Sequence, residues 1–383
     1  MNFVKKKILI VVGTRPEAIK MAPLTIKLLE NNDFFDVRIC LTAQHRQMLD
    51  QVLAFFSIKG DYDLNLMRPN QNLHVLTADI VVKMKEVYED FLPDWVLVHG
   101  DTTTSTAAAL SAFYSGIKVA HVEAGLRTLN KLAPFPEEMN RAITARIADL
   151  HFAPTISSKK NLLNEYISEE SITITGNTVI DALKLGLSKV NEDVNEEILQ
   201  LKSTVDFTKK IILVTGHRRE NFGDGFENIC AGLQQIAQTF KNEVEIVYPV
   251  HLNPNVQGPV NKLLAHEPNI KLIQPLNYEA FIWMMNKSCL IITDSGGVQE
   301  EAPSLGKPVL VMRDITERPE AVDAGTVILV GTNKDKIFNE ASKLLLDINY
   351  YEQMSNKHNP YGDGLASNRI ISKLKDEKVI EYV

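Results

Sequence analysis

The strongest constraint on the fold is an alternation, found twice along the chain, of short β-branched runs with longer stretches of helical length and period. Short apolar runs bounded by turn signals are typical of strands buried on both faces of a parallel sheet, and the helical stretches supply the crossovers. The predicted strands are Lys7–Val12, Val37–Leu41, Trp95–Val98, Lys118–Val122 and Leu150–Ala153, then Ile211–Thr215, Glu245–Tyr248, Ile270–Ile273, Leu290–Thr293, Pro308–Met312 and Thr326–Val330. The predicted fold class is α/β, with two Rossmann-like doubly wound domains.

The predicted strands divide the chain into two domains, and 383 residues are enough for two cores. We expect an N-terminal domain over residues 1–180 and a C-terminal domain over 209–365, joined by a polar connecting helix and linker at 181–208. Apolar residues at roughly helical spacing in 366–383 predict a last helix that completes the N-terminal domain. The two domains are expected to face a central cleft.

Charge and cysteine content exclude several classes of function. Forty-one basic residues stand against 48 acidic ones, and the formal net charge of −7 argues against a nucleic-acid partner. No apolar stretch is long enough to span a bilayer, so no membrane partner is expected. The three cysteines are odd in number and widely separated, which fits a reducing cytosol better than a disulfide framework. We expect a cytoplasmic protein.

One strand-to-helix turn suits a nucleotide diphosphate. The strand Leu290–Thr293 is followed by Asp294, Ser295, Gly296 and Gly297, where the chain turns into a helix. Two glycines let a ligand approach the backbone, and the N–H groups of a helix N-terminus favour a pyrophosphate. Glu301, about one helical turn later, can accept hydrogen bonds from ribose hydroxyls. The alternative is that the turn only caps a helix.

A second turn of this kind follows the first predicted strand. It contains Arg15 and Lys20, whose charges suit an anion, and Pro16, which suits a first helical position. The G-x-G-x-x-G fingerprint is absent after this strand and the P-loop motif is absent throughout, so neither NAD nor ATP-driven chemistry is indicated. A nucleotide is better placed as part of the substrate, and no cofactor is predicted.

Acid–base residues follow other predicted strands. Asp101 and Glu123 each lie just beyond a strand, where ligands bind in open α/β sheets. His217 also follows a strand, beside two arginines, and is suited to phosphate contact or proton transfer, with a solvated basic turn as the alternative. Glu137 lies in the first turn of a predicted helix, where complementing the helix dipole is a sufficient reason for it.

Metal and serine chemistry are less well supported. His99–Asp101 and His121–Glu123 each place two ligand types on one face of a strand, but no longer-range Cys/His pattern completes a metal site. No G-x-S-x-G elbow is present. The residues therefore indicate proton transfer by carboxylates and histidine, without a metal.

Long motifs along the chain resemble those of one enzyme family. They are GTRPEAIKMAPL at Gly13–Leu24, TAQHRQMLDQV at Thr42–Val52, HGDTTT at His99–Thr104, HVEAGLRT at His121–Thr128, PEEMNR at Pro136–Arg141, TGNTVIDAL at Thr175–Leu183, GHRREN at Gly216–Asn221, HLNPNV at His251–Val256, DSGGVQEEAPSLGKPVLVMRD at Asp294–Asp314 and TERPEAV at Thr316–Val322. Over almost its whole length the chain resembles the non-hydrolysing UDP-N-acetylglucosamine 2-epimerases of bacteria. The resemblance implies the two-domain fold shared with glycosyltransferases of the GT-B type.

The resemblance also implies a reaction. In such enzymes UDP is eliminated from the sugar to give a 2-acetamidoglucal, and it adds back after C2 has been reprotonated on the opposite face. The product, UDP-N-acetylmannosamine, would supply surface polysaccharide synthesis. By motif position Asp101, Glu123 and Glu137 become the proton-transfer and sugar-positioning carboxylates, and His217 assists the departure of UDP. Which carboxylate removes the C2 proton is left open.

The other expected contacts follow from motif position alone. Arg15 and Lys20 are expected to contact phosphate or sugar. The UDP contacts are expected at Ser295, Gly296, Gly297, Glu301, Phe281, Leu276 and Arg318, with Leu276 acting through its backbone. An allosteric site for a second UDP-N-acetylglucosamine would involve Gln44, Gln47, Arg218 and His251. At Asn70 some regulated relatives carry arginine, and Arg68 is the nearby arginine here. The family also implies a homodimer.

Three other functions are compatible with parts of these motifs. A GT-B glycosyltransferase would use the same UDP site, but it would need an acceptor cleft instead of carboxylates around C2. A hydrolysing 2-epimerase would share the fold and release free N-acetylmannosamine and UDP. A catalytically silent nucleotide-sugar sensor would keep the glycine turn and lose the acid–base residues, which are present here.

Overall fold

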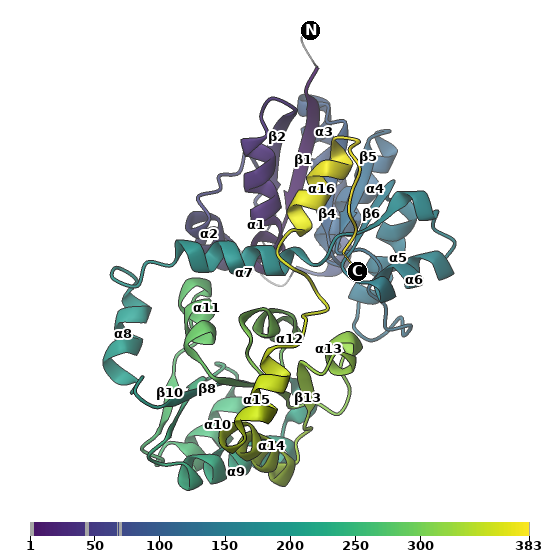
Figure 1. The fold of residues 1–383 in the computed structure, drawn as a ribbon. Helices are drawn as coiled ribbons and strands as arrows, with labels where there is room; N and C mark the ends of the chain where they lie inside the picture. Colours follow the sequence, from purple (N-terminus) through teal and green to yellow (C-terminus); the bar gives the residue numbers. More distant parts are fainter. Residues whose placement is uncertain (1–3, 43–45, 67, 69–70, 383) are drawn as a thin grey trace. The chain divides into compact units, whose positions relative to one another are not determined.

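The computed structural model describes residues 4–382 apart from 43–45, 67 and 69–70 (Figure 1). The chain forms two compact units. Unit 1 comprises Met1–Leu185 and Tyr361–Val383, and unit 2 comprises Gly186–Pro360. Each unit contains one sheet in which every strand pairing is parallel.

The strands and helices alternate along each unit. The strands of unit 1 are β1 (Lys6–Val12), β2 (Phe35–Leu41), β3 (Tyr62–Asp63), β4 (Trp95–His99), β5 (Lys118–Val122), β6 (Leu150–Ala153) and β7 (Ile172–Ile174). Those of unit 2 are β8 (Lys210–Thr215), β9 (Val244–Pro249), β10 (Ile270–Ile273), β11 (Leu290–Thr293), β12 (Val309–Val311) and β13 (Val327–Leu329). The helices are α1 (Arg15–Glu30), α2 (Arg46–Phe55), α3 (Leu73–Phe91), α4 (Thr103–Tyr114), α5 (Glu137–Ile147), α6 (Ile156–Asn164), α7 (Thr178–Lys189), α8 (Glu196–Thr204), α9 (Asp224–Thr239), α10 (Pro254–Leu264), α11 (Tyr278–Lys287), α12 (Gly296–Glu301), α13 (Pro319–Asp323), α14 (Lys334–Leu346), α15 (Ile348–Ser355) and α16 (Ala366–Leu374).

Both sheets have the strand order of a Rossmann fold. The order is β3-β2-β1-β4-β5-β6-β7 in unit 1 and β10-β9-β8-β11-β12-β13 in unit 2. Right-handed crossovers place the helices of the two halves of such a sheet on opposite faces, so the strand order reverses between β1 and β4 and between β8 and β11. The predicted α/β fold class with two doubly wound domains is confirmed, and each sheet has its own switch point for a ligand.

All the predicted strands are present, with ends that move by at most two residues. The structure adds β3 and β7, two short strands at the edges of the first sheet. β3 has only two residues, too few for an alternating or apolar pattern to distinguish it from a loop, whereas β7 is a buried β-branched run as long as the predicted strands β12 and β13.

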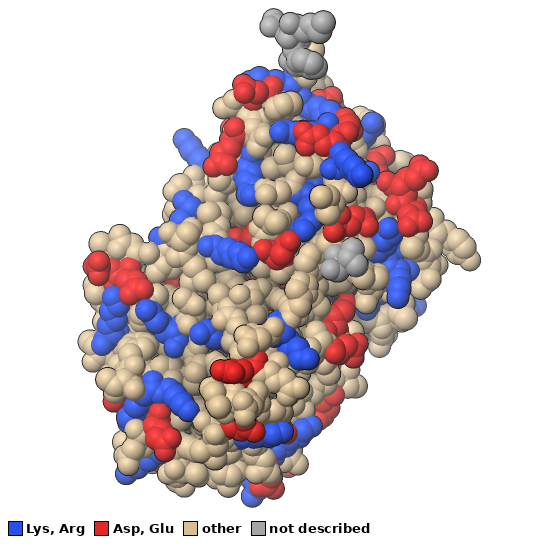
Figure 2. All heavy atoms as spheres, in the orientation of Figure 1, with Lys and Arg blue, Asp and Glu red and all other residues tan. Residues whose placement is uncertain are grey.

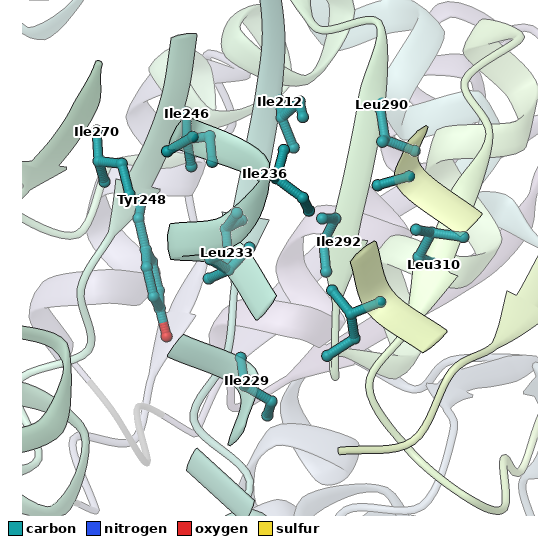
Figure 3. Close-up of a cluster of buried hydrophobic side chains, with 14 of the residues drawn as sticks. Ile212, Ile229, Leu233, Ile236, Ile246, Tyr248, Ile270, Leu290, Ile292 and Leu310 are labelled. Carbon is teal, nitrogen blue, oxygen red and sulfur yellow. The ribbon is translucent and has the colours of Figure 1, made fainter. Parts of the chain in front are cut away.

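Apolar side chains from both faces of the strands form the cores. In unit 2, Ile212, Ile292 and Leu310 from the sheet pack with Ile229 and Leu233 of α9 (Figure 3). In unit 1, the strands β1 and β4 pack against α3 and α4. Burying each such side chain stabilises the fold by about 1.5–3 kcal/mol. The packed strands hold their carboxyl ends in fixed register.

The last helix, α16, belongs to unit 1 and packs on α1 (Figure 1). Its first N–H groups are capped by the buried Asp181 of α7, which accepts hydrogen bonds from the amides of Ala366 (3.2 Å) and Ser367 (2.8 Å). A carboxylate at a helix N-terminus satisfies amides that lack intrahelical partners. The segment 361–383 is therefore fixed to unit 1 by polar as well as apolar contacts.

Surface charge is mixed. On the face shown in Figure 2, basic and acidic side chains are interspersed, as the nearly balanced composition suggests. Among the described helices, none combines the length and the apolar character that a bilayer crossing requires.

Candidate functional site

A buried carboxylate joins the two turns at the switch point of unit 1. Glu17 is 1% exposed. Its Oε2 accepts hydrogen bonds from the amides of Gly13 (3.0 Å) and Thr14 (2.8 Å), and its Oε1 accepts from the hydroxyls of Thr102 (2.6 Å) and Ser105 (3.0 Å). Burial raises the pKa of Glu17, and these hydrogen bonds partly offset the rise. The β1–α1 turn and the β4–α4 turn are thereby held together.

These two turns carry Arg15 and Asp101. Arg15 is the first residue of α1, and Asp101 lies two residues beyond β4. Helix α5 is fixed beside Asp101, because Asn140 donates to its carbonyl oxygen (2.9 Å) and Arg141 donates to its carboxylate (2.5 Å). Glu137, the half-buried first residue of α5, therefore lies one turn away from residues that contact Asp101.

Glu123 follows β5, the strand next to β4, and has a left-handed backbone (φ 63°) with 9% of its surface exposed. Its Oε2 forms an ion pair with Lys20 Nζ and accepts a hydrogen bond from Asn177 Nδ2 (2.8 Å). His99 Nε2 lies 3.8 Å from the same oxygen. A non-glycine residue in this backbone region is uncommon, and such strain concentrates at functional sites. The structure thus places Lys20 against Glu123.

The histidines of this region are buried and neutral. Burial lowers the pKa of His99 to about 4 and that of His121 to about 3. His121 Nε2 lies 2.7 Å from the carbonyl oxygen of Gly100 and donates to it. Both rings are uncharged near pH 7, so the ring of His99 adds no positive charge beside Glu123.

Acidification should therefore destabilise unit 1. A histidine in the unfolded chain has a pKa near 6.5. Below that pH the unfolded state binds protons at these histidines, and the folded state does not until the pH is much lower. The stabilisation is present above about pH 6.5 and is lost progressively toward pH 4, by about 3 kcal/mol for each histidine at the limit. We expect urea unfolding, followed by hydrogen exchange of β4 and β5 peptides at pH 7 to 4, to show this loss.

Glu17, whose pKa is raised, contributes to the pH dependence of stability with the opposite sign to these histidines. A matched pair of variants therefore separates the contribution of the histidines from that of the carboxylates. His121→Gln keeps a donor for the carbonyl of Gly100 and should flatten the pH dependence. His266→Gln, at an exposed histidine, should leave it unchanged. Equal slopes in the wild type and in His121→Gln would contradict the argument.

The switch point of unit 2 carries the glycine turn. Ser295 precedes α12, its amide donates to the hydroxyl of Thr293 (2.9 Å), and Gly296 and Gly297 begin the helix. A β-carbon on Gly297 would lie 3.8 Å from Glu301 Oε2, so this carboxylate stands beside the turn. The structure brings these four predicted residues together.

Arg318 lies against the same turn. A β-carbon on Gly296 would stand 3.3 Å from the Arg318 guanidinium carbon. Arg318 Nε donates to Glu300 Oε1 (2.8 Å), and Glu300 is 1% exposed. Glu300 thus orients Arg318, while Glu301 lies beside Gly297. The pairing of Glu300 with Arg318 was not predicted, although the sequence places Glu300 on a different helix face from Glu301.

The turn that follows β8 and contains His217 and Arg218, called the β8 turn below, lies next to the glycine turn, because β8 pairs with β11. Its residues His217 and Arg218 both donate backbone amides to the Asp294 carboxylate (2.8 Å each). The His217 ring stacks on that of His251, with centroids 5.2 Å apart. Arg218 Nη1 lies 3.9 Å from a carboxylate oxygen of Glu317. His217, Arg218 and His251 therefore form one group beside the glycine turn.

Two other predicted UDP contacts lie in α11 and in the loop before it. Leu276 is half-buried in the connecting loop, and Phe281 is half-buried in α11. Leu276 also lines a groove of about 760 Å³ between β10, α8 and α10. The residues that line this groove include no other predicted site residue. None of the acid–base residues lines this groove.

The predicted allosteric set is described in part. Gln44 and Asn70 lie outside the described residues, and Gln47 lies in α2. Arg68 forms an ion pair with Asp79 (3.1 Å). Arg218 and His251 have the contacts given above. Among the side chains that the structure describes, no three of His, Cys, Asp or Glu gather as a metal site would require.

Sequence reasoning missed Glu17, Asn177 and Arg141 as site residues, and it considered His99 only as a possible metal ligand and Asp294 only as the residue before Ser295. Asn177 follows the unpredicted strand β7, and Asp294 follows β11 directly. The available signal was position, because each of Asn177, Asp294 and His99 stands at or just after a strand end. Glu17 has the capping-box position, which usually needs no further role.

The fold recurs in a protein of very different sequence. The glycotransferase of kitacinnamycin is 11% identical and superposes with a TM-score of 0.64 over 97% of this chain and 99% of its own. At this identity the likeness concerns the fold alone. The predicted GT-B-like architecture is therefore confirmed.

Much closer similarity identifies the family. The family model for UDP-N-acetylglucosamine 2-epimerase matches residues 27–375. A UDP-N-acetylglucosamine 2-epimerase of Campylobacter jejuni is 58% identical over 374 residues, which are 96% of this chain and 97% of the relative. A UDP-GlcNAc 2-epimerase of Neisseria meningitidis, solved bound to UDP-GlcNAc, is 50% identical with a TM-score of 0.87, covering 97% of this chain and 100% of its own. Since both likenesses span nearly the whole chain, this protein belongs to the UDP-N-acetylglucosamine 2-epimerase family.

Proposed function

We propose that this protein interconverts UDP-N-acetylglucosamine and UDP-N-acetylmannosamine without hydrolysis, by eliminating UDP and adding it back. The observation that carries the proposal is the pair of carboxylates Asp101 and Glu123 beyond neighbouring strands, with Lys20 and Asn177 on Glu123 and Arg141 on Asp101. A glycosyltransferase has no need of acid–base groups for C2. An epimerase at C2 needs proton transfer on both faces of that carbon.

The reaction balances with these groups and no added reagent. A carboxylate takes the C2 proton, the C1–O bond to the diphosphate breaks, and the C–H electron pair becomes the C1=C2 double bond of a 2-acetamidoglucal. A second acid then protonates C2 from the opposite face as the diphosphate oxygen re-forms its bond to C1. We assign these proton transfers and the positioning of the sugar to Asp101, Glu123 and Glu137, with Arg15 as a contact for sugar or phosphate.

UDP is assigned to unit 2. Ser295, Gly296 and Gly297 offer backbone amides without large side chains, Arg318 adds positive charge, and Glu301 suits the ribose hydroxyls. The uracil is assigned to Phe281 and the backbone of Leu276. His217 assists the departure and return of the diphosphate. The Neisseria meningitidis relative was solved bound to UDP-GlcNAc, which supports a UDP-sugar as the ligand of this chain.

Isotope exchange at C2 tests the reaction. Protein incubated with UDP-N-acetylglucosamine in heavy water should place deuterium at C2 and yield UDP-N-acetylmannosamine, because every turnover passes through loss of the C2 proton. Neither metal nor NAD should be needed. Mass spectrometry and proton NMR follow the label, and the same reaction in the presence of a chelator is the control.

The products separate this proposal from its alternatives. Free N-acetylmannosamine with UDP would identify a hydrolysing epimerase, and transfer of the sugar to an acceptor without C2 exchange would identify a glycosyltransferase. Absence of any C2 exchange with intact UDP binding would indicate a sensor. Each of these results contradicts non-hydrolysing epimerisation.

Further parts of the proposal concern assembly and regulation. We propose that the product is used in surface polysaccharide synthesis. We also propose that the protein is a homodimer, and its mass can be measured by analytical ultracentrifugation. Activation by UDP-N-acetylglucosamine would involve Gln44, Gln47, Arg218 and His251. A sigmoidal dependence of rate on UDP-N-acetylglucosamine, lost in a His251→Ala variant, would support this activation.

A further inference from the structure

Asp294 occupies a special position in unit 2. It follows β11 and precedes the glycine turn, and its amide donates to the carbonyl of Thr215 at the end of β8 (3.1 Å). It is completely buried. Burying a carboxylate in this way is costly unless hydrogen bonds compensate the charge. The hydrogen bonds of the Asp294 carboxylate therefore indicate the role of its charge.

The two oxygens of Asp294 differ in their surroundings. Oδ2 accepts hydrogen bonds from the amides of His217 and Arg218 (2.8 Å each) and from Asn221 Nδ2 (3.4 Å). Oδ1 is buried, finds no hydrogen-bond partner among the described residues, and lies 3.6 Å from His217 Nδ1. The hydrogen bonds of Oδ2 fix the turn after β8, but they do not explain why the charge of Oδ1 is buried.

The imidazole is placed to use that oxygen. With its proton on Nδ1, His217 can donate toward Asp294 Oδ1 after a small approach, and hydrogen bonds at such sites often tighten only when a ligand binds. Nε2 is then the ring nitrogen left for a ligand, and the side chain is 45% exposed. The stacked ring of His251 limits rotation of the imidazole.

We propose that Asp294 is a positioning residue, which holds His217 with its proton on Nδ1 and stabilises the imidazolium that assists UDP during epimerisation. The inference rests on the proposed function, since it presumes that His217 meets the diphosphate. In elimination the imidazolium donates its Nε2–H to a diphosphate oxygen as the C1–O bond breaks. In re-addition the proton is held again on Nε2 as the bond re-forms.

The charges around His217 agree with this role. Burial lowers the pKa of His217, Asp294 raises it, and His251 and Arg218 lower it. Without the Asp294 charge, the cation would form only at a lower pH. A buried carboxylate behind a histidine is the usual way to fix the tautomer and favour the cation.

The test is Asp294→Asn, which has the same shape and can still accept from the amides of His217 and Arg218. Its NH₂ group would face Nδ1, so His217 should switch to the Nε2–H tautomer. We expect kcat to fall by about 10²-fold with little change in KM, and the alkaline limb of the kcat profile to move to lower pH. Nitrogen-15 NMR of the histidine rings in the whole protein reads the tautomer without relying on activity.

A control variant separates positioning from a purely structural role. Asn221→Ala removes one contact to Asp294 and one to the carbonyl of Met312 (3.1 Å), so it should lower thermal stability without moving the pH limb or the tautomer. An Asp294→Asn protein with the wild-type tautomer and pH profile overturns the inference. If the wild type shows no C2 exchange, the proposed function fails, while the NMR result still decides whether Asp294 sets the tautomer.

Discussion

Glu123→Gln is expected to lower kcat/KM for UDP-N-acetylglucosamine by about 10³-fold or more, because an amide cannot take up or return the C2 proton. The substitution keeps the size of the side chain. UDP affinity should stay within a few-fold, since the UDP contacts are assigned to unit 2. Kinetics for both epimers and calorimetry with UDP measure the two effects separately.

The surroundings of Glu123 explain why so large a loss is expected. Lys20, 13% exposed at its side chain, neutralises the carboxylate, and Asn177 fixes one of its oxygens (2.8 Å). Glu123 also has a left-handed backbone. The side chain is therefore oriented before substrate arrives, and preorganised groups lose most when their chemistry is removed.

Exchange experiments with both epimers also distinguish the carboxylates. If Glu123 serves one face of C2, the Glu123→Gln protein should lose deuterium wash-in from one epimer far more than from the other. Glu165→Gln is the matched control, because Glu165 is a carboxylate of unit 1 outside the assigned site. Its two oxygens accept hydrogen bonds from Arg127 Nε (2.6 Å) and Nη2 (2.8 Å). Wild-type rates in Glu123→Gln would remove Glu123 from the mechanism.

The fold was predictable from the sequence because buried parallel strands leave a strong local signal. The β-branched and apolar runs identify the eleven predicted strands, and right-handed crossovers place helices on both faces of each sheet. Strand β7, Ile172–Ile174, is also a buried β-branched run, and it was not among the predicted strands although the sequence carries its signal. As a result, Asn177, which follows β7 and donates a hydrogen bond to Glu123, was not predicted as a site residue.

The placement of the candidate site residues at strand ends was predictable, but their partners were not. A strand end marks Asp101, Glu123 and His217 as candidates, because parallel strands bring their carboxyl ends to one edge. No sequence rule shows that Lys20 of α1 meets Glu123 after β5, since that pairing depends on a contact 103 residues apart. The same holds for Asp294 and the β8 turn, which are 77 residues apart at His217.

Arg318→Ala should weaken UDP binding by about 10²-fold and lower the stability of unit 2 by about 3 kcal/mol or more. The guanidinium stands over Gly296 and pairs with Glu300, which is almost completely buried. Removing the arginine takes a cation from the assigned diphosphate site. It also leaves the Glu300 charge in the interior without its arginine, where it repels a diphosphate.

A double variant separates these two effects. In Glu300→Gln with Arg318→Ala the buried charge is gone, so thermal stability should largely recover, while UDP affinity should stay low because no cation has been restored. Arg369→Ala is the control for loss of an arginine–carboxylate pair, with Asp363 in unit 1 (2.7 Å), and should cost stability without changing the Kd for UDP. If UDP affinity recovers together with stability in the double variant, Arg318 supports the turn without contacting the nucleotide. If affinity stays low, the cation itself binds the diphosphate, and the glycine turn and Arg318 act as one site.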